Sequence, residues 1–533
     1  MARVIETDVC IVGAGITGAM VAEKLSEERD AGIVMMEGGS WSTPLEERFA
    51  ARERRLDYRE NPWSDDHIPG QKAPGINAPS MVVGGWAMHW GGTCPRFTPE
   101  DFNLASRYGV GHDWPISYQD LEPFYQEAEE RIGVAGEQGP PEFDVRSEPY
   151  PMPPVPLSWS LLQLKDWGES SGIPFWTNPV AKNSVPYDGR SVCQRCDTCE
   201  ICPTGAKYSP DFTLNRLLDA GRIELITRTL VRRLVPEDGS ARISHAVAVD
   251  RDAPEEEVHL RARTFVLAGG YVWSPHLLLL SGTGRFPDGL ANSSGLVGKY
   301  MTGHRPVSAY VELPMQLYPG EYTRHSLLSK AFQRPASGNR YVRHDLRIWE
   351  STVGREPRLR SDEGRILLGD EIMEDWRGRI SGTSTARVRA YYDVLPHRES
   401  RVTLDPDLRN PWGDPLPRVE FRDAETSGAL REHTEGRIRG LFEEMARVGN
   451  GKILSFGVGD IQDHPGGGCR MGDDPSTSVT DSYGRTHDHE NLFVVGAPTM
   501  VSGGCNNGTL TFAALSLRST TEIGREFPAR EGA

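Results

Sequence analysis

Long apolar runs are absent from this sequence. No stretch of its 533 residues approaches the roughly 18 consecutive apolar residues that a membrane-spanning helix needs. The apolar run near the N-terminus leads into a glycine-rich turn and lacks the small-residue cleavage site of a signal peptide. We therefore expect no membrane span and a cytoplasmic protein, with export in the company of a partner left open.

Basic residues are also in deficit. Lys and Arg number 59 against 75 Asp and Glu, which gives a formal net charge of −16. Nucleic acids and anionic membrane surfaces are bound through basic patches that neutralise phosphates. The charge balance therefore argues against both kinds of partner, and it would suit, weakly, a cationic partner or substrate.

Internal repeats and low-complexity tracts are absent as well. The hydrophobic fraction of 38% and the charged fraction of 25% are those of a soluble globular protein. A chain of this length exceeds what one hydrophobic core organises. We therefore expect two interleaved domains, or one large domain with insertions.

Cysteine is scarce, and half of the eight cysteines fall in one short run. The run CQRCDTCEIC, followed by Pro203, spaces its thiols three residues apart, so all four can reach one metal centre after a tight loop. A ferredoxin ligand run is similar but has three residues before its last cysteine. We predict an iron-sulfur cluster, [4Fe-4S] or [3Fe-4S], with a closed tetrahedral zinc site as the alternative. The predicted ligands are Cys193, Cys196, Cys199 and Cys202.

The other four cysteines are scattered along the chain. They are Cys10, Cys94, Cys469 and Cys505. Disulfides are rare in reducing compartments, so we expect these residues to be buried or free thiols.

A nucleotide-binding pattern opens the chain. Residues 8–12 form a short apolar strand, residues 13–18 read GAGITG, and the residues that follow have helical spacing. The glycines allow a tight turn, close approach of the backbone to a pyrophosphate, and packing of the helix on the strand. A second strand ends at Glu37, about 20 residues on, where a carboxylate can hold ribose hydroxyls. We predict a dinucleotide site for an unphosphorylated ribose, as in FAD or NAD.

Two further glycine-rich stretches favour the same ligand. Residues 81–97 read MVVGGWAMHWGGTCPRF, with glycine pairs on both sides of His89 and Trp90. This pattern favours a backbone pressed against a flat ligand over a plain surface loop. The stretch RTFVLAGGYVWSPHLLLLSG repeats the order of strand, glycine turn and helix around Gly269, so we assign it to the same domain.

The C-terminal region combines a histidine, two asparagines and a helix start. His464 opens the glycine-cushioned stretch HPGGGCRMG, and NLFVVGAPTM is a buried strand. Asn506 and Asn507 directly precede an apolar helix that begins near Thr509. Because a helix N-terminus carries partial positive charge, this arrangement favours an electron-rich ligand such as a reduced flavin.

The middle of the chain differs from both ends in composition and pattern. Residues 301–454 contain charged, strand-like stretches without a glycine fingerprint, and seven prolines between Pro140 and Pro156 exclude regular structure there. We predict an α/β chain with a Rossmann-like cofactor domain and an interleaved antiparallel-sheet substrate domain. The predicted divisions are a discontinuous cofactor domain (1–100, 205–300 and 455–533), an extended arm with the cysteine loop (101–204), and the substrate domain (301–454).

Several of these motifs together resemble the glucose-methanol-choline (GMC) oxidoreductase family of FAD enzymes. GAGITG with Glu37, HPGGGCRMG and NNGTLTFAAL carry the resemblance, which covers most of the chain. YGVGHDWPISYQDLEPFYQEAEERIGV, PMPPVPLS, PVAKNSVPYDGR and CPTGAKY are similar to the large flavoprotein subunits of bacterial FAD-dependent glucose dehydrogenase and gluconate 2-dehydrogenase. Those subunits carry an iron-sulfur cluster in this loop, with adjacent cysteines where this chain has uniform spacing. The resemblance implies the fold shared with pyranose oxidases, and FAD as cofactor.

The resemblance also implies catalytic roles. By position within the motifs, His464 matches the catalytic base and Asn507 matches its partner. Hydride transfer from an alcohol to flavin N5 requires loss of the hydroxyl proton, which a neutral imidazole can take. The plainer alternatives are a core histidine at a turn and an N-cap asparagine. Pyranose oxidases bond the flavin to a histidine that precedes Trp, so a covalent link at His89 stays an option.

The predicted function follows from these assignments. We predict a dehydrogenase that oxidises an alcohol of a sugar, glycoside, polyol or amino sugar. Electrons would leave through the cluster to a protein or small-molecule acceptor, for example a small partner subunit or a cytochrome. The alternatives are an O2-using carbohydrate oxidase with a structural metal site and a non-catalytic electron-relay flavoprotein. The residues predicted to contact the cofactor are Gly13, Ala14, Gly15, Ile16, Thr17, Gly18, Glu37, Gly84, Gly85, His89, Trp90, Gly91, Val231, Ala268, Gly269, Gly496, Ala497 and Thr509.

Overall fold

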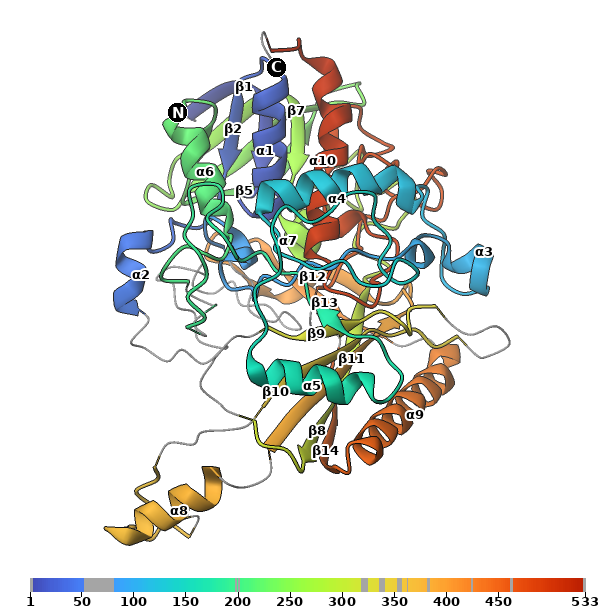
Figure 1. Cartoon of the computed structure of the whole chain (residues 1–533). Helices are drawn as coiled ribbons and strands as arrows, with labels where there is room; N and C mark the ends of the chain where they lie inside the picture. The colour runs from blue at the N-terminus through green and yellow to red at the C-terminus, as the bar shows by residue number, and fades with distance from the viewer. Residues whose placement is uncertain are drawn as a thin grey trace.

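Two sheets organise the chain in a computed structural model (Figure 1). The larger sheet lies near the two termini, and the smaller one lies below it in the view of Figure 1. The structure describes residues 3–51, 81–196, 199, 202–317, 325–334, 341–351, 357–361, 363–380, 384–422, 425–460 and 464–530.

The larger sheet has seven strands and includes both strands of the predicted nucleotide-binding motif. Its order is β4-β2-β1-β7-β6-β5, and β15 pairs with the C-terminal end of β7. Strands β1, β2, β4, β7 and β15 run parallel, while β5 and β6 are antiparallel additions. The strands are β1 (Arg3–Val12), β2 (Ile33–Met36), β4 (Glu224–Ile226), β5 (Thr229–Pro236), β6 (Ile243–Asp250), β7 (Glu257–Leu267) and β15 (Leu492–Val494).

Helices cover both faces of this sheet. Side chains alternate along β1, so that Val9 and Ile11 join one core while Cys10 joins the other. The first core is shared with α1, α6 and α10, and the second with α7. This burial on both faces explains why the strands are apolar runs without alternation. The helices are α1 (Ile16–Glu28), α6 (Pro210–Asp219), α7 (Gly270–Leu280) and α10 (Thr509–Ile523).

The turn between β1 and α1 is held by unusually close backbone contacts. A Cβ atom on Gly18 would lie 2.2 Å from the Gly13 carbonyl oxygen. Gly13 itself has φ of +107°, and a Cβ there would lie 2.8 Å from the Ala268 carbonyl oxygen. Only residues without side chains fit these positions, and they bring α1 and the end of β7 onto one turn.

The smaller sheet is antiparallel along its whole length. Its order is β14-β8-β11-β10-β9-β3, and helices α5 and α9 pack against one face through a shared apolar core. Figure 1 shows α5 in front of the smaller sheet and α9 to its right. The elements are β14 (Lys452–Val458), β8 (Gly303–Leu313), β11 (Ser384–Val394), β10 (Leu346–Glu350), β9 (Leu327–Ser329), β3 (Trp176–Thr177), α5 (Trp159–Glu169) and α9 (Glu425–Val448).

Shorter elements connect the two sheets. Helix α4 begins after a Ser117 capping box and packs against α10, whereas the proline-rich stretch after residue 139 has no helix or strand until α5. The remaining elements are α2 (Leu45–Ala51), η1 (Gly85–Met88), η2 (Pro99–Phe102), α3 (Leu104–Tyr108), α4 (Tyr118–Ile132), β12 (Arg401–Arg409), β13 (Pro415–Glu420), η4 (Ala497–Thr499) and η5 (Gly524–Glu526).

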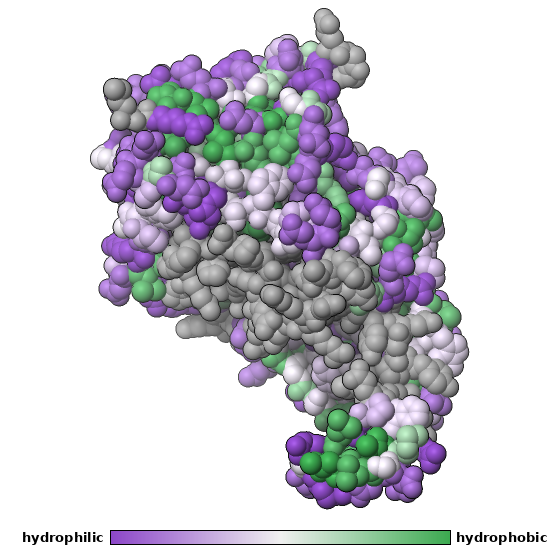
Figure 2. Space-filling model, turned by 90° about the vertical axis from the view of Figure 1, so that its left-hand side faces the viewer, coloured by the Kyte–Doolittle hydropathy of each residue, from purple (hydrophilic) through white to green (hydrophobic). Residues whose placement is uncertain are grey.

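Helix α8 (Asp370–Ile380) belongs to an arm that projects from the smaller sheet (Figure 1). The short strand-like segment before it is closed by a bridge between Arg360 and Ile366. Leu359, Ile366 and Leu368 expose 68%, 54% and 70% of their surface, and Figure 2 shows hydrophobic side chains gathered at this end of the molecule.

Most of the predicted elements are confirmed, including the α/β class with a Rossmann-like sheet and an antiparallel sheet. Strand β3 belongs to the smaller sheet, although it comes from the segment that we predicted to be an extended arm. A strand of only two residues leaves no recognisable pattern in the sequence. None of the eight cysteines, all of which lie in the described part of the chain, forms a disulfide, and the four scattered ones are buried, as predicted. None of the helices in the described part of the chain combines the length and apolarity that crossing a bilayer requires.

We predict that Gly18→Ala lowers the free energy of unfolding by about 1–3 kcal/mol, because the added methyl forces α1 away from the Gly13 carbonyl. Urea unfolding measures this. The matched control is Gly436→Ala on an exposed face of α9, where a Cβ meets nothing within 4 Å. The control should raise stability by about 0.5–1 kcal/mol through helix propensity. Equal effects of the two changes would contradict this account of the turn.

Candidate active site

The glycine turn ends at an open helix N-terminus. Helix α1 begins at Ile16, and its N-cap residue is Gly15, which offers no side chain to the first turn. The buried Glu37 carboxylate accepts hydrogen bonds from Ala14 N through Oε2 and from Gly39 N through Oε1, both at 2.9 Å. A carboxylate at this position can also accept hydrogen bonds from ribose hydroxyls.

Other predicted cofactor residues converge on this turn. Gly84 N donates to the Ala14 carbonyl at 2.9 Å, and Gly15 forms a parallel bridge with Gly84. A Cβ on Gly496 would lie 2.4 Å from Thr17 Cγ2. A Cβ on Gly15, in contrast, would meet only the Gly85 Cα at 4.0 Å, so the turn keeps an open cradle. This cradle at a helix N-terminus fits a pyrophosphate.

The remaining predicted cofactor residues are more dispersed. Trp90 is buried and donates from Nε1 to the Tyr208 carbonyl at 2.9 Å, and the half-buried His89 lies 6.0 Å from Trp86 between ring centroids. Val231 packs in the core behind the larger sheet, and Gly91 is exposed. Gly269 is the N-cap of α7, Ala497 begins η4 and Thr509 is the first residue of α10.

His464 and Asn507, the residues predicted as base and partner, lie in direct contact. Asn507 Nδ2 donates to His464 Nε2 at 2.9 Å, while Asn507 Oδ1 is buried and has no hydrogen-bond partner among the described residues. His464 has φ of +59°, a conformation that is costly for a residue with a side chain and is common at functional sites. Gly508 is the N-cap of α10 and no side chain caps the helix, so the N-cap alternative for Asn507 is wrong.

A second histidine, His304, was not predicted. It is fully buried on β8, and its Nε2 lies 3.3 Å from His464 Nδ1. Its ring centroid lies 4.2 Å from that of Tyr391. Since an amide NH2 only donates, His464 Nε2 accepts from Asn507, and the ring proton sits on Nδ1 and is donated to His304. No sequence motif marks His304, which lies 160 residues from its partner.

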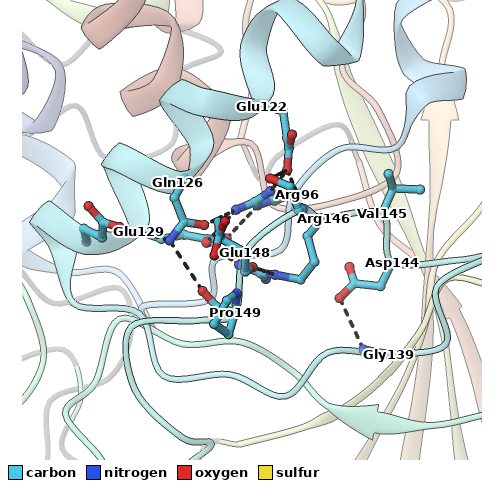
Figure 3. Close-up of polar contacts among 12 residues, drawn as sticks. Arg96, Glu122, Gln126, Glu129, Gly139, Asp144, Val145, Arg146, Glu148 and Pro149 are labelled. Carbon is cyan, nitrogen blue, oxygen red and sulfur yellow. Dashed lines mark hydrogen bonds and ion pairs between the residues drawn. The ribbon is translucent and has the colours of Figure 1, made fainter.

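A buried ion network supports the segment beside Asn507. Asn506 Nδ2 donates to the Arg96 carbonyl at 3.1 Å. The Arg96 guanidinium binds the Glu129 carboxylate through two contacts of 2.8 Å, and Arg146 adds a contact of 2.5 Å (Figure 3). Burial alone would lower the pKa of Arg96, but Glu129 outweighs it and holds that pKa above its usual range. The network ties the proline-rich arm, α4 and the active-site loop together.

Comparisons with known proteins identify the family. Two family models described as GMC oxidoreductase match residues 168–306 and 396–516. The fructose dehydrogenase large subunit of Gluconobacter japonicus is 29% identical, over 97% of this chain and 98% of that protein. The 2-methyl-1,2-propanediol dehydrogenase of Mycolicibacterium austroafricanum is 30% identical, over 98% and 96%. Pyridoxine 4-oxidase from Mesorbium loti shares the fold, with a TM-score of 0.60 and 18% identity over 97% of this chain and 99% of that one.

The chain belongs to the GMC oxidoreductase family. Membership implies FAD binding, which fits the open cradle at Gly15 and the Glu37 carboxylate. It also makes the chain an oxidoreductase that acts on alcohol groups.

The cysteine loop of this GMC oxidoreductase is attached to the predicted flavin loop around Trp90. Lys207 Nζ donates to the carbonyls of Met88 and Trp90 at 2.8 and 3.0 Å, while its backbone N–H donates to Cys202 Sγ at 3.4 Å. Trp90 also donates to Tyr208, the next residue. One lysine therefore contacts both loops.

Lys182 and Lys207 face each other across an antiparallel bridge at the base of the cysteine loop. They are 1% and 2% exposed, and Lys182 interacts with the thiol of Cys199. Burial lowers the pKa of Lys182, but the thiolates of Cys199, Cys193 and Cys202 outweigh this effect and raise it. Burial lowers the pKa of Lys207 to about 8, although Cys202 and Cys199 oppose the change.

The arrangement of the predicted metal ligands is only partly described. Residues 197, 198, 200 and 201 lie outside the described residues. Within the described part, no group of three or more His, Cys, Asp or Glu side chains is placed to hold a metal ion. The donor chemistry nevertheless fits a thiolate-ligated centre, because such a centre carries the negative charge that two buried ammonium groups require.

We predict that Arg96→Met lowers the free energy of unfolding by about 3–5 kcal/mol, because it leaves the buried Glu129 carboxylate poorly compensated. Urea unfolding of the holoenzyme measures the change, and the double variant Arg96→Met with Glu129→Gln should recover much of it. Arg447→Met, which breaks a surface pair on α9, is the control and should be without measurable effect. Equal losses in the single and double variants would contradict the role of Glu129.

Proposed function

We propose that this GMC oxidoreductase is an FAD-dependent dehydrogenase that oxidises an alcohol group of a sugar, glycoside, polyol or amino sugar to a carbonyl. The observation that carries the proposal is the 2.9 Å contact between Asn507 Nδ2 and His464 Nε2, which directs a basic nitrogen and an amide donor at one point. A substrate hydroxyl needs both groups: an acceptor for its proton and a donor for its oxygen.

The glycine turn and its neighbours would hold the cofactor. Residues 13–18 would bind the pyrophosphate and Glu37 the ribose, while residues 84–91 and 496–497 would contact the remainder. FAD supplies a hydride acceptor at flavin N5 when it is bound. We assign residues 1–100, 205–300 and 455–533 to this domain and residues 301–454 to the substrate domain.

His464 would act as the general base. Its Nε2 lone pair, now occupied by Asn507, would accept the hydroxyl proton as the hydride leaves the same carbon. General-base help of this kind is typically worth about 10²- to 10⁴-fold. Asn507 would donate to the substrate oxygen and cannot take the proton, so the two groups do not compete.

His304 would position the base. The contact between His464 Nδ1 and His304 Nε2 fixes which ring nitrogen carries the proton, so that Nε2 stays available to the substrate. It also offers a hydrogen bond that strengthens when His464 becomes positively charged. The αL backbone at His464 would be maintained by the same contact.

We further propose that Cys193, Cys196, Cys199 and Cys202 hold an iron-sulfur cluster, which supplies one-electron transfer when it is bound. The lysine pair supports this assignment. Like charges directly opposite each other in a sheet are unfavourable, and burial increases the cost. Thiolates of a metal centre would compensate Lys182 and Lys207, and the contacts of Lys207 to both loops support a centre that lies beside the predicted flavin loop.

An electron acceptor would complete the reaction. A small partner subunit, a cytochrome or a small molecule would take the electrons, and the protein would work in the cytoplasm or be exported with its partner. The relative named as a fructose dehydrogenase large subunit supports a multi-subunit arrangement. Peroxide formation in step with turnover would instead favour an oxidase.

We predict that His464→Ala retains FAD but slows anaerobic bleaching of the flavin by an oxidisable alcohol about 10²- to 10⁴-fold. Stopped-flow absorbance measures the rate, and the flavin spectrum reports cofactor content. His433→Ala on α9 is the matched control and should leave the rate unchanged. An unimpaired His464 variant would exclude this mechanism and favour an electron relay without alcohol chemistry.

We predict that anaerobically purified protein contains iron and acid-labile sulfide. The double variant Cys196→Ala with Cys199→Ala should lose most of the iron, because it keeps two of the four predicted thiol ligands. Cys469→Ala, which changes a buried cysteine outside the loop, should keep it. Metal analysis and low-temperature EPR measure both. Zinc in place of iron would contradict the cluster.

A further inference from the structure

Strands β8, β10 and β11 have one apolar and one polar face. The apolar face, with Val307, Val388 and Ile348, packs against α5 and α9. Because side chains alternate along a strand, the intervening residues point to the opposite face. This second face, which we call the arginine face, includes His304, Asp345, Arg347, Trp349, Arg387, Arg389, Tyr391 and Asp393.

The arginine face is continuous with the candidate base. His464 contacts His304, and the ring of His304 lies 4.2 Å from Tyr391. The Arg389 guanidinium lies 4.1 Å from the Tyr391 ring, and that of Arg347 lies 5.3 Å from it. A chain of direct contacts therefore leads from the reacting end of the site to two cations.

The charge on this face is incompletely compensated. Arg347 and Arg389 lie directly opposite each other in the register of β10 and β11, which is unfavourable for like charges. Asp345 binds Arg347 Nε at 2.6 Å, but Arg389 forms no ion pair with any other described residue. Within the same described part, Arg347 Nη2 and Arg389 Nε also lack hydrogen-bond partners, although Arg347 is only 1% exposed.

Cation–π contacts with Trp349 and Tyr391 explain where the Arg389 side chain lies, but they do not give its Nε a hydrogen-bond acceptor among the described residues. Its guanidinium lies 4.5 Å from Trp349 and 4.1 Å from Tyr391, so aromatic rings hold its flat faces. Cation–π contacts act on the faces of the guanidinium, whereas its N–H groups point outward in its plane. A guanidinium held in this way is preorganised for an anion with two or more oxygen atoms.

On the basis of the proposed alcohol oxidation, we infer that the substrate carries a carboxylate or a phosphate, bound by Arg347 and Arg389 while its hydroxyl lies at His464 and Asn507. The substrate class is therefore an acidic sugar or polyol. Trp349 and Tyr391 would pack against its carbon skeleton.

The arginine face opposes the expectation from net charge. An acidic chain would weakly suit a cationic substrate, yet Arg347 and Arg389 lie on the face that contacts His304, and among the described residues the Asp345 carboxylate is ion-paired with Arg347 alone. An amino sugar would be repelled by Arg389, and a neutral sugar would leave the Arg389 guanidinium without an ion-pair partner.

The first experiment compares matched sugars with the intact holoenzyme. Glucose, glucosamine and glucose 6-phosphate share the pyranose ring and differ mainly in charge, while gluconate presents a carboxylate on an open chain. We expect kcat/KM for gluconate or glucose 6-phosphate to exceed that for glucose by about 10- to 100-fold, the range for a charge-assisted hydrogen bond. Glucosamine should be the poorest substrate. A preference for glucose or glucosamine would overturn the inference.

The second experiment removes one cation. Arg389→Met should lower kcat/KM for the acidic sugar about 10- to 100-fold, mainly through KM, and change the value for glucose less than about twofold. Arg389→Lys should restore part of the loss, and Arg447→Met should have no effect. Equal loss for acidic and neutral sugars would indicate a structural role and overturn the inference.

A third measurement needs no variant and applies if Arg389→Met fails to fold. Inorganic phosphate should compete with an oxidisable neutral sugar in the wild-type enzyme at constant ionic strength, with chloride as the control salt. Absence of competition would overturn the inference, while oxidation of the neutral sugar would still support the proposed function. If no alcohol at all bleaches the flavin, the proposed function itself fails.

Discussion

The close approach of backbone at the first glycine turn is the constraint on which the architecture depends. Gly13 and Gly18 allow β1, α1 and the end of β7 to meet with separations that a single methyl group would prevent. Gly496 makes the same kind of contact with Thr17 from the far end of the sequence. Segments from the beginning, middle and end of the chain thus meet at one turn, which is the physical reason to propose a discontinuous cofactor domain.

The contact between His464 and Asn507 depends on helix packing and side-chain contacts rather than on close backbone approach. Asn507 stands at the start of α10, whose position follows from packing against α1 and α4, and the neighbouring Asn506 is tied to the Arg96 carbonyl. His464 comes from a separate loop in an αL conformation, and His304 approaches it from the smaller sheet. The candidate site therefore combines a loop residue, the residue before the N-cap of α10 and a strand residue of the smaller sheet.

Secondary-structure elements could be predicted from the sequence better than the tertiary contacts between them. Strand, glycine turn and helix were readable from GAGITG because local backbone geometry demands glycine there, and α10 begins at Thr509 as predicted. The pairing of His464 with Asn507 was available only through the family resemblance. His304 and the arginine face were missed, because alternation along a strand shows which residues share a face but not what that face meets. In the sequence these residues belong to charged, strand-like stretches, a pattern that does not reveal that Arg347 is almost fully buried.

Net charge misleads for the same reason. The excess of acidic residues is an average over the whole chain, and it carries no information about where charge is buried. Lys182 and Lys207 concentrate positive charge beside the cysteine thiols, and Arg347 and Arg389 do so beside the candidate base. The lysines face each other across an isolated antiparallel bridge and the arginines across paired strands, arrangements that cost stability unless anions compensate them. These pairs are therefore the local observations that support the proposed thiolate centre and the proposed acidic substrate, which the total charge cannot provide.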